Sequence, residues 1–133
     1  TETAIFTNRN KATYASKTNF IDILLGGTFA SIEASAANNL GSVRLVKNAT
    51  LGGSPSYADI NATDSVVEID VAGTTVTGGT ELLTNPLAGK NDSKIMDLVN
   101  LTIILAPNDT LTIAGTSANS ATINAGILWK DLF

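Results

Sequence analysis

Histidine and cysteine are both absent from the 133 residues of this chain, and only 15% of its residues are charged. These two residue types carry much of the acid–base, nucleophilic and metal-binding chemistry that proteins perform near neutral pH. Without cysteine the chain also has no disulfide and no zinc–thiolate site. We therefore expect that the protein is not an enzyme and that it uses no cofactor and no metal ion.

The charged residues that are present do not form a strong cluster. The net charge is −4, and the densest basic group, Arg9, Lys11 and Lys17, lies near the N-terminus. Nucleic-acid binding requires clustered lysine and arginine, and a membrane-spanning helix requires about 20 predominantly apolar residues in a row. Because the sequence has neither feature, we expect neither nucleic acid nor membrane as a partner.

Short segments of alternating apolar and polar residues make up most of the chain. In residues 65–72, valine and isoleucine occupy every second position, which is typical of a strand with one buried face. Residues 99–105 and 121–129 repeat the pattern, and the second of these segments places Trp129 on its core-facing side. Helical periodicity is nearly absent, so the sequence predicts an all-β protein.

Turn signals separate these segments. Gly26-Gly27 predicts a turn between two strands at residues 20–25 and 28–34. Residues 106–109, with proline in the second position, predict a type I turn.

About eight to ten short strands with frequent turns are typical of a β-sandwich or a barrel. The length suits one domain. We expect a jelly-roll-like antiparallel β-sandwich of two four-stranded sheets over residues 20–133. An immunoglobulin-like sandwich and an open barrel are the alternatives. Residues 1–19 are more polar, and we expect them to form an N-terminal arm with one or two short strands.

Several segments resemble small virion proteins of tailed phages, of the head-decoration (cement) and fibre-knob kind. The resemblance covers about residues 40–133 and rests on residues 43–48, 64–70, 77–80, 105–114 and 121–131, which read VRLVKN, DSVVEID, TGGT, LAPNDTLTIA and ATINAGILWKD. It implies a jelly-roll-like subunit, usually trimeric, on the outside of a capsid. Such proteins often carry glycine in the proline turn; this chain has Asn108, which tolerates the same left-handed conformation.

The resemblance leads us to expect a capsid decoration or cement protein that binds the major capsid protein and stabilises the head. Its location would be the exterior of the virion, and its second partner would be itself, as a homotrimer. The alternative is a receptor- or glycan-binding knob of a phage fibre or baseplate. In that case loops around Tyr57 and residues 85–93 would recognise the glycan.

The interface candidates lie in three places. The arm contributes its basic group, which could reach onto a capsid protein, Tyr57 lies in a loop rich in glycine, proline and serine, and the chain ends on two apolar residues. We expect that these last two pack on a neighbouring subunit or back on the sandwich. The candidates are Arg9, Lys11, Tyr14, Lys17, Tyr57, Leu132 and Phe133.

Three groups of oxygen-bearing side chains have residue types that occur in acid–base or calcium sites. Glu68 and Asp70 share one face of a strand, and we expect that face to be solvated. The other groups are Asn91, Asp92 and Asp97, and Asp59, Asn61 and Asp64. Both lack the dense aspartate spacing of calcium loops, so we expect side chains that bond the local backbone in turns.

Overall fold

A computed structural model of the chain describes residues 2–33 and 39–133. Strands make up 63% of it. Their bounds are β1 (Thr3–Asn10), β2 (Thr13–Tyr14), β3 (Lys17–Thr18), β4 (Asp22–Glu33), β5 (Gly41–Lys47), β6 (Thr50–Gly53), β7 (Ala58–Asp59), β8 (Val67–Asp70), β9 (Gly73–Thr77), β10 (Thr80–Leu87), β11 (Ser93–Asp97), β12 (Ile104–Leu105), β13 (Thr110–Ser117) and β14 (Thr122–Leu132). One 3-10 helix, η1, covers Val99–Leu101. Across the described residues, no helix is long and apolar enough to cross a bilayer.

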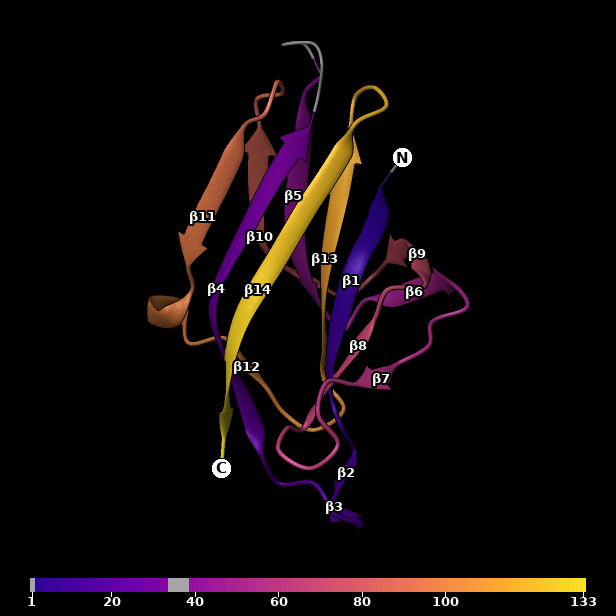
Figure 1. The fold of residues 1–133 in the computed structure, drawn as a ribbon, viewed down its shortest axis with the longest axis vertical. Coiled ribbons are helices and arrows are strands. Elements are labelled where there is room, and N and C mark those ends of the chain that lie inside the picture. The colour runs from indigo at the N-terminus through magenta and orange to yellow at the C-terminus, as the bar shows by residue number, and fades with distance from the viewer. Residues whose placement is uncertain (1, 34–38) are drawn as a thin grey trace.

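Two antiparallel sheets form the body of the molecule (Figure 1). The larger has six strands in the order β10-β5-β13-β1-β8-β7. In the smaller, β4 is central: β14 pairs with it from Asp22 to Glu33, while β11 and β12 lie end to end along its other side. The predicted all-β sandwich is therefore confirmed, with sheets of six and four strands instead of four and four.

The main core lies between the two sheets. Fully buried aliphatic side chains come from both of them, among them Leu25 and Ile32 of β4, Leu45 of β5 and Ile113 of β13. A smaller cluster on the opposite side of the six-stranded sheet includes Val46 and Val76, where the paired β6 and β9 cover it.

The predicted N-terminal arm is wrong for residues 3–10. This segment is β1, which lies inside the six-stranded sheet with β13 on one side and β8 on the other. Its polar residues suggested a loop, but several of them are buried and paired: Thr7 bonds the hydroxyl of Thr112 at 2.8 Å, and Asn10 donates to two backbone carbonyls. Tertiary pairing therefore overrides the local preference of these residues.

The predicted turn at Gly26-Gly27 is also wrong. β4 runs without interruption from Asp22 to Glu33, and neither glycine has a positive φ. Against β14, Leu128 pairs with Gly27 and Trp129 with Leu25, so Gly26 is an extra residue, a β-bulge. A glycine pair can mark a bulge as well as a turn, and residue 34 of the expected second strand lies outside the described residues.

Residues 99–105 do not form the single strand that their alternation predicts. η1 and the short β12 replace it. The Asp97 carboxylate accepts a bond from Val99 N at 2.9 Å, and Leu98 N donates to the carbonyl of Gly26 at 3.0 Å. The bulge in β4 is thus matched by a break in the strand beside it.

The turn at residues 106–109 is present, but it is of type II. Asp109 N donates to the carbonyl of Ala106 at 2.9 Å, which closes the turn. Asn108, in the third position, has a φ of 72°, and a positive φ there distinguishes type II from type I. The expectation that Asn108 tolerates a left-handed conformation is confirmed.

Candidate docking surface

The outer side of the four-stranded sheet carries large apolar side chains in the open. Phe29, Ile95 and Leu128 are 50%, 87% and 70% exposed. They come from three different strands, and register brings them together: Ile95 is opposite Phe29, and Leu128 is opposite Gly27, which in turn is opposite Asp97. We call these three side chains the outer apolar face.

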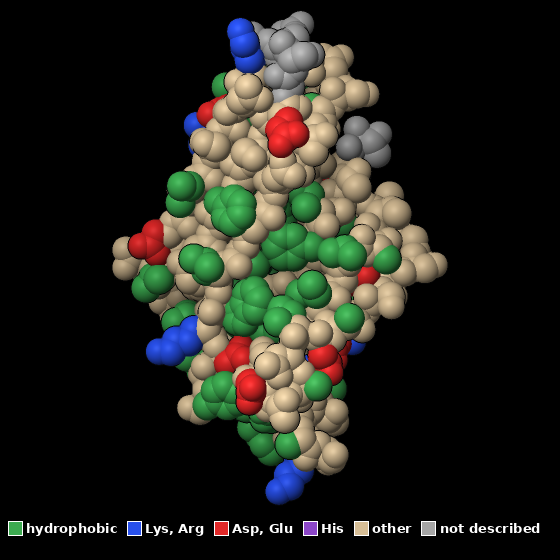
Figure 2. Space-filling view, viewed as in Figure 1, with side chains coloured by type: hydrophobic (Ala, Val, Ile, Leu, Met, Phe, Trp, Pro, Cys, Tyr) green, Lys and Arg blue, Asp and Glu red, His purple; other side chains and the backbone are tan. Residues whose placement is uncertain are grey.

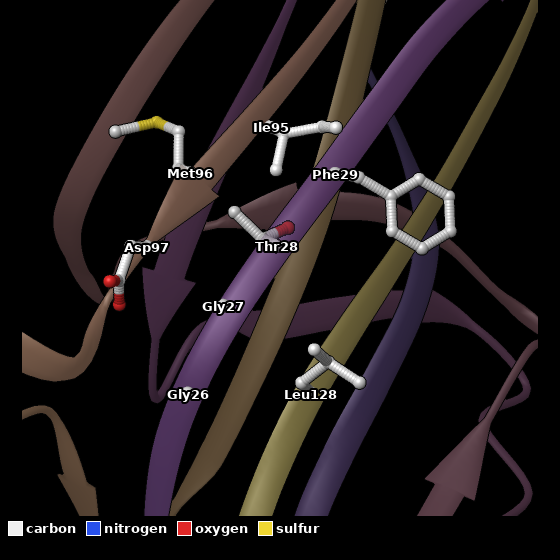
Figure 3. Close-up of a pocket in the computed structure, with 8 residues that line it drawn as sticks. All are labelled: Gly26, Gly27, Thr28, Phe29, Ile95, Met96, Asp97 and Leu128. Carbon is white, nitrogen blue, oxygen red and sulfur yellow. The ribbon is translucent and has the colours of Figure 1, made fainter.

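A shallow hollow of about 340 Å³ lies among these side chains (Figure 3). Glycine helps to shape it. A Cβ added to Gly126 would lie 2.2 Å from Cε1 of Phe29, so the Phe29 ring occupies the space above that glycine. The ring therefore lies over the backbone of β14, where it fills one wall of the hollow.

The space-filling view shows hydrophobic side chains gathered across the middle of this side of the molecule, with charged side chains scattered around them (Figure 2). Contiguous exposed apolar surface of this kind marks interaction sites in soluble proteins. Fully burying one such side chain against a partner would contribute about 1.5–3 kcal/mol to the free energy of association.

The lining of the hollow is mostly apolar. Asp97 is its one charged lining residue, and its carboxylate is engaged by the Val99 N–H. The Thr28 hydroxyl donates to the carbonyl of Gly126 at 2.9 Å. The lining offers apolar area and no pair of groups placed for proton transfer or nucleophilic attack.

The basic interface candidates of the N-terminal segment are engaged in ion pairs. The Arg9 guanidinium pairs with the Glu68 carboxylate, and the Lys11 ammonium lies 2.9 Å from Asp59. Lys11 is also buried and donates to the carbonyl of Ser65 at 3.2 Å. Of the three basic residues, Lys17 remains exposed, in β3, as a candidate for contact with a partner.

Tyr57, the aromatic candidate for glycan recognition, already stacks on another side chain of the same protein. The Arg9 guanidinium carbon lies 3.7 Å from the centre of its ring, a cation–π contact. Partial burial raises the pKa of the Tyr57 phenol, and the positive charge of Arg9 opposes that shift. One face of the ring is therefore unavailable to a ligand.

The last interface candidates meet at the end of the molecule. The rings of Tyr14 and Phe133 are 6.1 Å apart and tilted by 56°. Tyr14 also donates from its hydroxyl to the carbonyl of Thr63. Leu132 and Phe133 remain 37% and 75% exposed, so the C-terminus packs back on its own chain only in part.

Carboxylates of the acid–base and calcium candidates bond the backbone of their own fold. Asp70 is buried and accepts bonds from the backbone N–H groups of Ser56, Ala72 and Gly73, which corrects the expectation of a solvated face. Asp92 accepts from Ala88 N at 2.8 Å, and this bond is the main reason that the pKa of its carboxyl is lowered.

Asn61 caps its own turn by accepting from Thr63 N and Asp64 N, which confirms the turn interpretation for that group. In the part of the chain that the structure describes, no three acidic side chains gather as a metal site would require.

Sequence reasoning missed the outer apolar face. Phe29 and Ile95 each looked like an ordinary strand residue, because alternation along one strand does not say which side the neighbouring sheet covers. Residues 28–33 contain a signal: Ala30 and Ile32 lie on one side of a strand and Phe29 lies on the other, so both sides carry apolar residues. Such a segment predicts either burial on both sides or an exposed apolar face.

Comparison with known proteins gives no relative: no protein-family model, no curated protein and no solved structure matches this chain. Any functional assignment therefore rests on the residues of this chain.

Proposed function

We propose that the chain is a structural virion protein that decorates the outside of a capsid as a homotrimer and stabilises the head. The outer apolar face is the surface that contacts the major capsid protein. The observation that carries this proposal is the exposure of Phe29, Ile95 and Leu128 on one sheet face. A surface that binds without reacting suits a cement protein.

The resemblance of residues 40–133 to head-decoration proteins supports the same assignment. The place of contact differs from the sequence-based expectation, because residues 3–10 are held inside a sheet and cannot reach out as an arm. In this proposal the outer side of the four-stranded sheet contacts the capsid protein instead.

The test is binding to capsids stripped of their accessory proteins, measured by mass photometry together with the oligomeric state of the free chain. We expect a trimer that saturates the capsid surface, and we expect Leu128→Lys to weaken binding at least tenfold, since it places a charge in a dry contact. Val71→Lys is the matched control: Val71 is 74% exposed, close to the 70% of Leu128, but follows β8. If Leu128→Lys and the unmodified chain bound capsids with equal affinity, this face would be excluded as the capsid contact. If the unmodified chain did not bind capsids, the proposed function would be excluded.

The glycan-binding knob is the weaker alternative. Its main aromatic candidate, Tyr57, has one face covered by Arg9. Its second candidate region, residues 85–93, consists of the end of β10, a turn held by Asp92, and the start of β11. A glycan array with the purified chain would revive this alternative if it gave saturable binding that Tyr57→Ala removes.

A further inference from the structure

The two sheets differ in width, and this leaves one flank of the sandwich open. At one side β11 contacts β10; at the other, Ile123 of β14 lies over β13, 3.2 Å from where a Cβ on Gly115 would be. The four-stranded sheet ends at β14, while the six-stranded sheet continues with β1, β8 and β7 (Figure 1). The inner sides of β1 and β8 are covered where Asn10 bonds Leu105 of β12, and they are open where Ile5, Phe6 and Ile69 line a groove.

The open flank is an apolar groove of about 410 Å³. Its apolar lining includes Ile5, Phe6, Ile69, Val71, Ile127 and Trp129. A second hollow of about 350 Å³ shares Ile5 and continues to Ile123. The β14 residues that line the two hollows lie between Ile123 and Trp129, about 20 Å along the strand, the length of about seven residues. We call this the flank groove.

β14 borders the flank groove with an unused edge. It is 11 residues long, and β4 is its one strand partner within residues 2–33 and 39–133. Along such a strand, every second residue directs its N–H and C=O away from the neighbour, where they can pair with another extended chain. The edge contains no proline that would block this pairing.

One polar side chain lies in this apolar lining without a partner. Asn8 is 1% exposed, and neither Nδ2 nor Oδ1 forms a hydrogen bond to any described residue. By contrast, Asn10, which follows Asn8 by two residues in β1 and is equally buried, donates to the carbonyls of Ile21 and Leu105 at 2.7 and 3.0 Å. A buried amide without partners is costly. A hydroxyl side chain on the inward side of an added strand would supply both a donor and an acceptor.

A negative charge lies beyond the Trp129 end of the groove. Asp131 is two residues past Trp129, on the same side of β14. Its Oδ1 is buried with no hydrogen-bond partner in the described chain, and it takes part in none of the ion pairs found there. A basic side chain would complement it.

We propose that the flank groove binds an extended segment of a partner polypeptide, which adds to β14 as one antiparallel strand. Alternate side chains of the segment enter the groove, most of them apolar and one a hydroxyl that bonds Asn8, and a basic side chain near its N-terminus pairs with Asp131. This mode is strand addition to a sheet edge. The site is separate from the outer apolar face, so it does not depend on the proposed function.

A folded second copy does not fit the same place. An antiparallel pairing of β14 with β14 of another copy about a two-fold axis would put both six-stranded sheets on one side of the joined sheet. There the continuing strands β1, β8 and β7 of the two copies would overlap. The groove therefore suits a single strand.

The test uses the whole chain and a synthetic peptide of alternating valine and threonine, about nine residues long, with arginine first and threonine in place of one valine. NMR-detected amide exchange is the readout. We expect the peptide to slow exchange at alternate residues of β14, and we expect a version with central proline, which lacks N–H donors, to have no effect. Binding that protects no β14 amide would overturn the proposal. So would edge protection that already exists without peptide and grows with protein concentration, because a second copy would then be the occupant.

Two variants separate this site from the outer apolar face. Val71→Lys places a charge at an exposed position of the groove and should weaken peptide binding at least tenfold without unfolding the chain. Leu128→Lys, on the outer face of the same strand, should change it less than about fivefold, since it alters only a cross-strand contact outside the groove. The reverse pattern would overturn the proposal. Since the capsid test predicts the opposite pattern for these two variants, either proposal can fail alone.

Asn8→Leu tests the amide itself. Because the substitution removes an unpaired polar group from an apolar site, the chain should unfold at the same or a higher temperature. Peptide affinity should nevertheless fall about tenfold, since the hydrogen bonds to the added strand are lost. Unchanged affinity would remove Asn8 from the site, and with it the argument for a hydroxyl of the ligand at this position.

Discussion

One asparagine decides the geometry of the turn between β12 and β13. Asn108 holds a φ of 72°, and its N–H donates to the carbonyl of Asn10 at 2.9 Å, which joins the turn to the end of β1. A side chain with a Cβ pays about 1–2 kcal/mol in the left-handed region, and asparagine is among the residues that tolerate it best.

Asn108→Ala should therefore lower the free energy of unfolding by about 1 kcal/mol, while Asn108→Gly should leave it unchanged or raise it slightly. Urea unfolding followed by tryptophan fluorescence measures both. If alanine and glycine at this position gave equal stability, the positive φ would not be a property of the folded protein in solution.

At the level of elements, a buried amide network joins the ends of β1 and β4. Asn19 Nδ2 donates to Asn10 Oδ1 and to the carbonyl of Lys11 at 2.7 and 2.9 Å, and Asn19 Oδ1 accepts from Ile21 N at 2.9 Å. Both donors of the Asn19 amide and its oxygen are bonded inside the protein, in contrast to Asn8.

Asn19→Ala should lower the free energy of unfolding by about 2 kcal/mol, because it leaves several buried groups without partners. Asn124→Ala is the matched control, since Asn124 is exposed and its side chain bonds Glu33 at the surface; its effect should stay within about 0.5 kcal/mol. Chemical denaturation of both variants gives the comparison. Similar losses of unfolding free energy in the two variants would mean that the buried network contributes no more than a surface hydrogen bond.

For the whole molecule, acid should weaken the fold partly through Asp109. Burial acts to raise the pKa of its carboxyl, but hydrogen bonds from Asn48 and Ala106 N, with Lys47 at 3.3 Å, lower it below the ordinary value of 3.8. A carboxylate with a lowered pKa stabilises the folded state above the pKa of the unfolded chain, and that contribution disappears as the pH falls through the folded pKa.

The midpoint of thermal unfolding should thus fall as the pH drops below 3.8, and it should fall less in Asp109→Asn. Calorimetry at a series of pH values checks this. An identical acid dependence in the variant would show that other carboxylates carry it, and Asp97→Asn, at an exposed position, serves as the control.

The sequence by itself determined the class of the fold and much of its strand content. Alternation in residues 65–72 and 121–129 reflects the two-residue period of a strand, and that period is a local property. It also determined that the chain lacks histidine and cysteine chemistry, because composition does not depend on folding. The tolerance of Asn108 for a positive φ belongs here too.

Only the tertiary structure decided which polar residues are buried, which strands meet and which apolar residues stay outside. β1 is in the sheet because β8 and β13 satisfy its backbone and Thr112 pairs with Thr7, and no local pattern encodes those partners. The continuity of β4 through Gly26 depends on its pairing with β14. The outer apolar face and the flank groove arise from the register and unequal width of two sheets, and both depend on contacts between residues far apart in the chain.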